Sequence, residues 1–352
     1  MGLLHVLLLL LSACACVALC ACSWGSVWSG VLVSMVTAGC ALSWARAQSS
    51  GGSVHAEGRG VLITGCDSGF GHGLALRLSA RGLQVFAGVL DPEGPGAQSL
   101  SLDPGGIRVL HMDVTEPQHI AQARARVEAE LGDTGLWGLV NNAGLLLCPV
   151  DAELHPTSCF RRLMEVNFLS AVAVTQAFLP LIRRARGRVV NMSSLAGEVT
   201  MPRFSAYSSS KAALACFSRV LRLEMLRWGV HVCLIQPSGF KTKIFSSDTS
   251  CLRQELLSAC SPDVLRDYGS DYISQLPSSL DFMSQNAMQD ISPVLDCMEH
   301  ALLSRCPRAL YCPGPAAWLL PFLQRHLPTA AFDWIITRFI WATFCPSAAP
   351  RL

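Results

Sequence analysis

A tyrosine and a lysine stand four residues apart in the segment AYSSSKAAL, residues 206–214, and together could move a proton. Residues four apart share one face of a helix, so Tyr207 and Lys211 would point at the same place. A free tyrosine has a pKa near ~10, which is too high for a base at neutral pH. A nearby ammonium group favours the phenolate and lowers that pKa. The pair therefore predicts a general base that takes the proton of a hydroxyl group.

Two polar residues that precede this pair could complete a catalytic group. Ser194 follows the segment RVVNM, thirteen residues before Tyr207, and could hydrogen-bond the substrate oxygen. Asn167, in MEVNF, could support a water beside Lys211 and complete a proton path. Each residue also has an ordinary structural explanation, because Tyr207 could be a core aromatic, Ser194 a cap and Lys211 a solvated charge. The neighbouring segments of the sequence distinguish the catalytic explanation from the structural one.

A glycine-rich segment, VLITGCDSGFGHG at 61–73, runs from an apolar stretch into a helical one. Its spacing, G-x-x-x-G-x-G, allows a tight turn and a close approach of the backbone to a pyrophosphate, which the N-terminus of the following helix would bind. A glycine pattern alone is weak, but its position between a strand and a helix favours a dinucleotide loop. The expected contacts from this loop are Gly65, Asp67, Ser68, Gly69, Phe70 and Gly71.

An acidic residue ends the next apolar run, in FAGVLDPEG, where a carboxylate can accept hydrogen bonds from both ribose hydroxyls of the adenosine half. Asp91 holds that place, and it would repel a 2′-phosphate. No Lys or Arg stands in the glycine loop or beside Asp91, and Asp67 adds a second negative charge, so we expect NAD rather than NADP. The alternative is a solvated Asp91 that starts a DPEG turn.

Two further segments reach the expected cofactor site. Asp113 ends the third apolar run and is placed to touch the adenine edge. The segment NNAG, 141–144, ends the fourth run with small residues where the cofactor must lie close, and Asn141, Ala143 and Gly144 are its expected contacts.

Six short runs rich in Val, Ile and Leu lack polar alternation, which suits strands covered on both faces. They are GVLIT (60–64), QVFAGVL (84–90), IRVLHM (107–112), GLVNN (138–142), RVVNM (188–192) and HVCLIQ (231–236). Helical stretches at 117–131, 157–184 and 207–227 lie between them. This alternation predicts an α/β fold with one Rossmann-like, doubly wound parallel sheet in a single domain at 60–312.

The alternation stops after the sixth run. Residues 237–290, rich in Ser, Asp and Met, predict an irregular or helical excursion that would form the substrate loop. A helix near 292–303 and a short strand at 309–311 would close the sheet. The C-terminal tail, 313–352, is strongly apolar and could lie on a membrane surface or pack on its own domain.

The N-terminal region, 1–50, differs from the rest of the chain, and a polar linker at 51–59 follows it. It contains two uncharged apolar runs, at 3–22 and 27–44, and the first is long enough to cross a bilayer. A cleaved signal peptide is the alternative, but the start lacks basic residues. No Lys or Arg precedes Arg46, which follows both runs, and this favours retained membrane helices and a cytosolic globular domain.

The combination of TGCDSGFG, NNAG, the asparagine of EVNF, Ser194 and YSSSK resembles the short-chain dehydrogenase/reductase family over about residues 59–312. The resemblance implies a catalytic tetrad of Asn167, Ser194, Tyr207 and Lys211, with Tyr207 and Lys211 also touching the cofactor and Ser194 and Tyr207 the substrate. It further implies cofactor contacts from Pro237, Gly239 and Thr242. One departure stands at Ser238, where the family usually has glycine, and it leaves the geometry of that loop open.

Within the family, the chain is similar to a branch of membrane-anchored hydroxysteroid, retinol and 3-hydroxybutyrate dehydrogenases, through ITGCDSGFG and GLWGLVNNAG. The resemblance implies oxidation of a 17β-hydroxysteroid to a 17-ketone with NAD, in the membrane of the endoplasmic reticulum. Oxidation of an 11β-hydroxysteroid or of retinol is the alternative, and a non-catalytic NAD-binding membrane protein is a third. The segments 145–150 and 195–204 are mostly apolar and would suit a lipid alcohol.

Composition limits the other partners. The net charge of +2 gives no reason to expect nucleic acid. The cysteines form no CxxC pair, so no metal site is expected. The helices at 157–184 and 207–227 pair subunits in many members of the family, so the resemblance implies a homodimer.

Overall fold

The computed structural model describes residue 39 and residues 52–245, 257–258 and 260–340. The two apolar runs expected to span a membrane therefore lie outside the described residues, apart from Gly39. The chain divides into two compact units, Met1–Val54 with Ser304–Cys306, and His55–Leu303 with Pro307–Leu352. In the first unit, Ser53 and Ser304 form an isolated antiparallel bridge. The candidate site lies entirely in the second unit.

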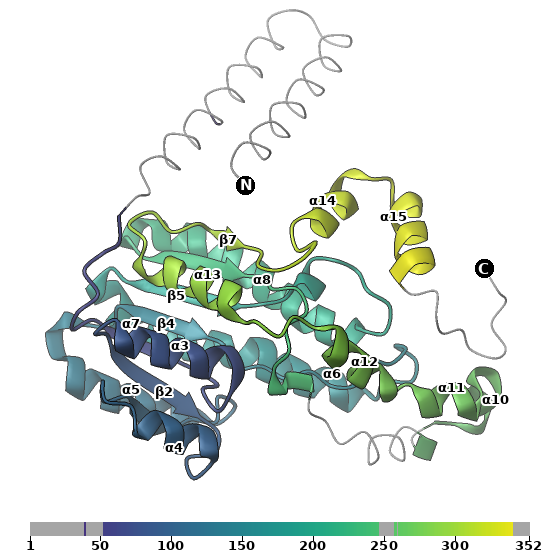
Figure 1. Cartoon of the computed structure of the whole chain (residues 1–352), viewed down its shortest axis with the longest axis horizontal. Coiled ribbons are helices and arrows are strands. Elements are labelled where there is room, and N and C mark those ends of the chain that lie inside the picture. Colours follow the sequence, from purple (N-terminus) through teal and green to yellow (C-terminus); the bar gives the residue numbers. More distant parts are fainter. Residues whose placement is uncertain (1–38, 40–51, 246–256, 259, 341–352) are drawn as a thin grey trace, which may run out of the picture. The chain divides into compact units, whose positions relative to one another are not determined.

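The second unit is built on one parallel sheet, which has seven strands in the described residues (Figure 1). The strands are β1 (Gly60–Ile63), β2 (Gln84–Val89), β3 (Arg108–His111), β4 (Gly138–Asn141), β5 (Arg188–Met192), β6 (His231–Ile235) and β7 (Leu310–Tyr311). Their order is β3-β2-β1-β4-β5-β6-β7. The order reverses between β1 and β4, and ligands of such sheets bind beyond the carboxyl ends of the strands at this switch point.

Helices cover both faces of the sheet, as the near-continuous burial of its strands requires. On one face lie α3 (Gly69–Ala80), α4 (Pro95–Ser101) and α13 (Ser292–Leu303). On the other lie α5 (Pro117–Leu131), α6 (Thr157–Met164), α7 (Ser170–Ala185) and α8 (Ser205–Met225). Two short 3₁₀ turns, η1 (Gly132–Thr134) and η4 (Leu226–Trp228), follow α5 and α8.

One apolar core packs strand residues against α5, α7 and α8. Leu62, Phe86 and Leu139 from the sheet and Phe178 from α7 are each fully buried in it. Burial of one such side chain contributes about 1.5–3 kcal/mol. This core fixes the strands and the helix that carries the tyrosine and the lysine.

The helix expected at 157–184 is one continuous element in which a π-helical turn, η2 (Glu165–Leu169), joins α6 to α7. Among the described residues, this is the one helix long and apolar enough to cross a membrane. It packs against β4, α5 and α8, so it serves as a core helix of the domain. Single π-turns inside helices often mark functional sites, and this one holds Asn167.

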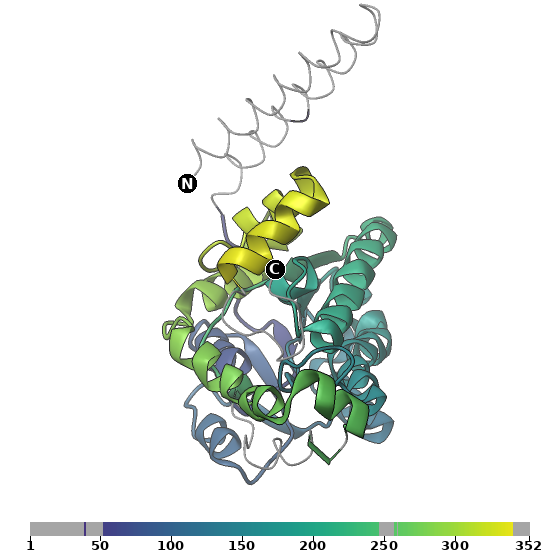
Figure 2. The same ribbon diagram turned by 90° about the vertical axis from the view of Figure 1, so that its right-hand side faces the viewer.

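The excursion after β6 is helical in its described part. It contains η5 (Lys243–Phe245), α10 (Pro262–Tyr268), α11 (Ser270–Gln275) and α12 (Ser278–Asn286). The C-terminal tail forms α14 (Leu319–His326), α15 (Thr329–Ile335) and a π-turn, η6 (Ile336–Ile340), yellow in Figure 2. Phe332 and Ile336 are buried against Leu195 and Val199, so the described part of the tail packs on its own domain.

The predicted α/β fold with one Rossmann-like, doubly wound parallel sheet is confirmed. Every strand run named from the sequence contains an observed strand, and the short run at 309–311 contains β7. The expected helices at 117–131, 157–184, 207–227 and 292–303 are also present.

Candidate active site

A cavity of about 420 Å³ opens at the carboxyl ends of β1, β4, β5 and β6. It therefore lies at the switch point of the sheet, where a dinucleotide is expected. The sequence-predicted residues in its wall are Gly65, Asp67, Ser68, Gly69, Phe70, Ala143, Gly144, Ser194, Tyr207, Lys211, Pro237, Gly239 and Thr242. Five others do not line it, namely Gly71, Asp91, Asp113, Asn141 and Asn167.

The tyrosine and the lysine are both presented by the first turns of α8, because helical spacing places residues four apart on one face. The Lys211 Nζ atom lies 5.8 Å from the centre of the Tyr207 ring and donates to the main-chain oxygen of Met192 at 3.0 Å. Ser194 follows β5 and lines the cavity together with Tyr207, and its Oγ accepts from Ala196 N at 3.2 Å. Three residues from two elements thus meet at one end of the cavity.

The pKa of Tyr207 is raised in the polypeptide by itself, so the expected depression, to which the positive ring of an oxidised cofactor would also contribute, stays a prediction. Burial raises the pKa of Tyr207 to about 12, and the polar influence of the nearby Ser194 hydroxyl offsets this rise only in part. Burial also lowers the pKa of Lys211 to about 8, since a buried ammonium group loses its hydration. The same burial that protects the site from water thus opposes the charged form of both groups.

Asn167 is fixed by hydrogen bonds to its neighbours. Its Nδ2 donates to Leu145 O at 2.9 Å and to Ser210 Oγ at 3.0 Å, and its Oδ1 accepts from Leu145 N at 2.7 Å. A methyl group on Gly144 would lie 3.3 Å from Asn167 Oδ1 and 3.2 Å from Lys211 Nζ, so Asn167 and Lys211 flank the same small residue. The side chain therefore anchors the loop after β4, and the expected water path through Asn167 stays a prediction.

The glycine loop has the geometry that a dinucleotide needs. Gly65 has φ +69°, and a methyl group there would lie 2.8 Å from Ala143 Cα. A methyl group on Gly71 would lie 2.4 Å from Gly65 O, so this glycine lets α3 pack closely behind the turn. Within α3, which is described in full, the first turn has neither an acidic residue nor a side-chain cap. Its N–H groups are therefore available to a phosphate.

Two carboxylates stand where the adenosine ribose is expected. The Asp67 carboxylate accepts hydrogen bonds from Leu90 N at 2.9 Å and from Asp91 N at 3.0 Å. It thereby holds the turn after β2 that carries Asp91. Asp91 is exposed, and its Oδ1 accepts from Glu93 N at 3.1 Å. The DPEG turn and a ribose-facing Asp91 are therefore compatible.

Asp113 and Asn141 make contacts inside the protein. Thr115 donates from its N and its Oγ1 to Asp113 Oδ1, at 2.9 and 2.7 Å. These bonds and the nearby His119 and His111 hold the pKa of Asp113 below its usual value, against its partial burial. Asn141 Nδ2 donates to Thr175 Oγ1 and Asn191 Oδ1 in the core.

One polar residue of the site that the sequence did not identify is the next one along, Asn142. Its Nδ2 donates to Thr64 O at 2.9 Å and to Gly65 O at 3.0 Å, so it ties the loop after β4 to the glycine loop. Thr64 Oγ1 in turn accepts from Asn142 N and Ala143 N, at 3.1 and 3.0 Å. Adjacent residues at a strand end point to opposite faces, and only the three-dimensional register shows which one faces the cavity.

The loop after β6 accommodates Ser238 in place of the usual glycine. Gly314 stands opposite with φ +103°, and a methyl group there would lie 2.1 Å from Ser238 Oγ. The hydroxyl thus uses space that exists because residue 314 has no side chain. Ser238 Oγ is buried and has no hydrogen-bond partner among the described residues. Gly239 has open space around it, and Thr242 approaches Gly69.

The opposite wall of the cavity is apolar. Both segments named from the sequence contribute, 145–150 through Leu145 and Leu146, and 195–204 through Leu195, Ala196, Met201 and Phe204. The excursion adds Ile244, Phe245 and Met283, which the sequence did not identify. Apolar walls with a few polar groups are typical of sites for small hydrophobic ligands.

The chain matches the family model described as short chain dehydrogenase over residues 59–251. It is similar to estradiol 17-beta-dehydrogenase 2 of Mus musculus, with 44% identity over 83% of this chain and 77% of that protein. It is also similar to 11-beta-hydroxysteroid dehydrogenase type 2 of Oryctolagus cuniculus, with 42% identity over 83% of this chain and 72% of that protein.

A solved structure of a short-chain dehydrogenase from Streptomyces avermitilis has the same fold. The TM-score is 0.63 and the sequence identity is 25%, over 81% of this chain and 98% of that one. The matched stretch of the family model contains the glycine loop, Ser194, Tyr207 and Lys211.

Proposed function

The chain belongs to the short-chain dehydrogenase family, an oxidoreductase family, and we propose that it oxidises a secondary alcohol of a steroid with NAD. The reaction converts a 17β-hydroxyl to a 17-ketone. The observation that carries this proposal is the meeting of Ser194, Tyr207 and Lys211 in the wall of one cavity whose opposite wall is apolar. The similarity to an estradiol dehydrogenase supports the choice of a 17β-hydroxysteroid.

The cofactor is held by the glycine loop and by the residues that follow β2, β4 and β6. The N-terminus of α3 takes the pyrophosphate, and Gly65 and Gly144 let the backbone approach it. Asp91 takes the adenosine ribose, and Pro237, Gly239 and Thr242 contact the nicotinamide end. Bound NAD supplies the hydride acceptor and, when oxidised, a positively charged ring.

Tyr207 accepts the proton of the substrate hydroxyl. Ser194 hydrogen-bonds the same oxygen and holds it in line with the phenol. Since burial raises the pKa of Tyr207 to about 12, the proton transfer depends on positive charge beside the ring. Lys211 supplies part of that charge from 5.8 Å, although burial lowers its own pKa to about 8.

NAD is the proposed cofactor rather than NADP because two carboxylates share the ribose end. Asp67 accepts hydrogen bonds from the backbone beside Asp91, so the charges of Asp67 and Asp91 lie close together. A 2′-phosphate placed there would meet both of them. The cellular pool of NAD is mainly oxidised, which favours the direction from alcohol to ketone.

The second candidate is oxidation of an 11β-hydroxysteroid, which the similarity to an 11-beta-hydroxysteroid dehydrogenase favours. The discriminating experiment assays membranes containing the full chain with NAD or NADP against estradiol, testosterone, cortisol and retinol. Preferred turnover of estradiol or testosterone with NAD supports the proposal. Preferred turnover of cortisol selects the second candidate, and no turnover of any alcohol would indicate a non-catalytic protein.

The membrane and the oligomer belong to the same proposal. The apolar runs at 3–22 and 27–44 anchor the protein in the endoplasmic reticulum with its domain in the cytosol. A chain that starts at Ser53 should lose membrane partitioning and keep the cofactor fold. The homodimer forms through the helix α6–η2–α7 and through α8 with η4, where Leu169, Leu223 and Leu226 are exposed apolar residues. Light scattering of the detergent-solubilised protein measures the subunit number.

A further inference from the structure

The loop that follows β5 bears both the serine of the site and much of its apolar wall. It begins at Ser194, passes through the short turn η3 (Leu195–Gly197) and reaches Met201. Leu195, Ala196 and Met201 all line the cavity. Any contact that sets the path of this loop therefore sets the shape of the wall.

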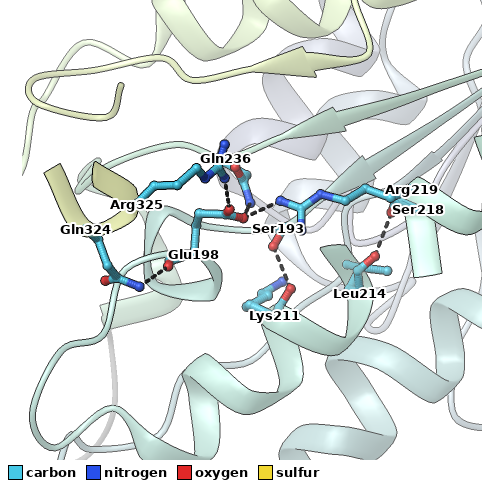
Figure 3. A network of polar contacts seen from close by, with 9 residues as sticks. All are labelled: Ser193, Glu198, Lys211, Leu214, Ser218, Arg219, Gln236, Gln324 and Arg325. Atoms are coloured by element: carbon cyan, nitrogen blue, oxygen red, sulfur yellow. Dashed lines mark hydrogen bonds and ion pairs between the residues drawn. The ribbon is translucent and has the colours of Figure 1, made fainter. Parts of the chain in front are cut away.

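One carboxylate on this loop is held from three directions (Figure 3). Glu198 pairs with Arg219 of α8, and its Oε1 accepts from Arg325 of α14 at 2.5 Å. Gln236, which follows β6, donates to Glu198 Oε2 at 3.4 Å. The Glu198 side chain is only 15% exposed, whereas an ordinary surface ion pair is exposed on both sides. Because Arg219 lies on the helix that carries Tyr207, this contact also fixes the loop relative to the base.

The C-terminal helix α14 holds the main chain of the same loop. Gln324 Nε2 donates to Glu198 O at 3.0 Å, and Gln324 Oε1 accepts from Thr200 N at 2.8 Å. Thr200 Oγ1 donates to the same oxygen at 3.2 Å. Phe332 and Ile336 then pack on Leu195 and Val199, so polar and apolar contacts act on the same stretch.

The ionic state of Glu198 suits this role. Burial would raise the pKa of its carboxyl group, but the hydrogen bonds from Arg219 and Gln236 and the charges of Arg219 and Arg325 outweigh that effect. The pKa is therefore held below its ordinary value, and the carboxylate stays ionised at neutral pH.

We infer that Glu198 is a positioning residue through which α14 sets the apolar wall at Leu195 and Met201, so that the C-terminal helices determine the affinity for substrate. They touch neither Asp91 nor the glycine loop in the described contacts, so they do not determine the affinity for the cofactor. The kinetic part of this inference rests on the proposed steroid oxidation. The structural part, that α14 orders residues 195–201, does not.

The test uses the full chain in membranes or detergent with the paired substitution Gln324→Ala and Arg325→Met. Loss of a charged and a neutral hydrogen bond should raise KM for the steroid roughly tenfold. The value of kcat should change less than about threefold, because the wall contacts substrate in the ground state and the transition state alike. The Kd for NAD, measured by protein fluorescence, should be unchanged. The single variant Arg325→Lys keeps the positive charge and leaves Gln324 in place. It should retain most of the affinity of the unmodified protein for the steroid.

The matched control is Arg338→Met, an exposed arginine of the same C-terminal segment for which the described residues show no ion pair. It should leave KM as it is. Hydrogen exchange gives a readout that needs no turnover, and the amides of residues 195–201 should exchange roughly tenfold faster in the paired variant than in the control. If the fold proves sensitive to the pair, Glu198→Gln is the milder variant and should show the same pattern with a smaller change.

Unchanged exchange in the loop, or a loss of NAD affinity equal to the loss of steroid affinity, would overturn the inference. If no steroid is turned over by the unmodified protein, the proposed function fails. The exchange measurement still decides the positioning role in that case.

Discussion

Lys211 donates from Nζ to Met192 O at 3.0 Å while its charge stands 5.8 Å from the centre of the Tyr207 ring. The lysine is therefore held by the end of β5, and in the proposed mechanism its charge would act on the phenol through space. Removing its charge should raise the pKa of Tyr207 further. Since alcohol oxidation needs the phenolate, log kcat/KM rises with pH up to that pKa.

In Lys211→Met we expect the rising limb of the kcat/KM profile to move to higher pH by about one unit or more. The measurement is steroid oxidation between pH 6 and 10. The exposed Lys241, changed to Met, serves as the control and should leave the limb in place. If the rising limb of the kcat/KM profile lies at the same pH in both variants, Lys211 has no electrostatic role.

Tyr207→Phe keeps the ring and removes the hydroxyl. Turnover should fall by at least ~10²-fold, the usual scale for loss of general acid–base catalysis. NAD affinity, measured by fluorescence titration, should be retained because the aromatic ring still fills its place against Phe204. Near-normal turnover in this variant would reject Tyr207 as the base.

Asp91→Ser removes the carboxylate at the proposed ribose contact. Loss of charged hydrogen bonds should lower NAD affinity roughly ten- to a hundredfold. NADP should lose far less, because a repulsion disappears with the same substitution. The ratio of kcat/KM for the two cofactors measures this, with Glu93→Gln as the matched control on the same exposed turn. A preference for NADP in the unmodified protein would overturn both the role of Asp91 and the oxidative direction.

Gly314→Ala should destabilise the protein, because the new methyl group would lie 2.1 Å from Ser238 Oγ and would hold φ +103° with a side chain. The expected loss is about 1–3 kcal/mol in the free energy of unfolding. Adding Ser238→Gly should restore the share of the lost unfolding free energy that is due to the clash. The share that is due to backbone strain at residue 314 should remain lost. Denaturant unfolding of the two single variants and the double variant measures the coupling. Equal losses with and without Ser238 would mean that the two residues do not interact.

The sequence predicted those parts of the site that local spacing determines. The glycine loop, Tyr207 and Lys211 each depend on a strand or helix period within one short segment, and the structure brings them to one cavity. The two asparagines after β4 show the limit of this reasoning. Asn141 was expected at the cofactor but hydrogen-bonds Asn191 in the core, while Asn142 holds the glycine loop. Which of two adjacent residues faces the ligand depends on how the strand sits in the sheet.

Contacts between distant segments were beyond the reach of sequence patterns. The pKa of Tyr207 rises through burial, which depends on everything packed around it and not on the spacing to Lys211. The hydrogen bond from Thr200 N to Gln324 Oε1 joins residues more than a hundred positions apart. The tail could be recognised as apolar from its composition, but its partner, the loop after β5, could be found only in three dimensions.

The helices α14 and α15 are made after every strand of the sheet and every residue of the proposed tetrad. A ribosome that has just finished β7 has therefore produced a domain whose loop after β5 still lacks the packing of Phe332 and Ile336. A premature stop codon in this last stretch of the gene would leave the sheet, the glycine loop and Tyr207 intact. Such an allele would encode a protein that still binds the cofactor but binds its alcohol substrate with low affinity. A test for bound NAD would therefore miss the defect.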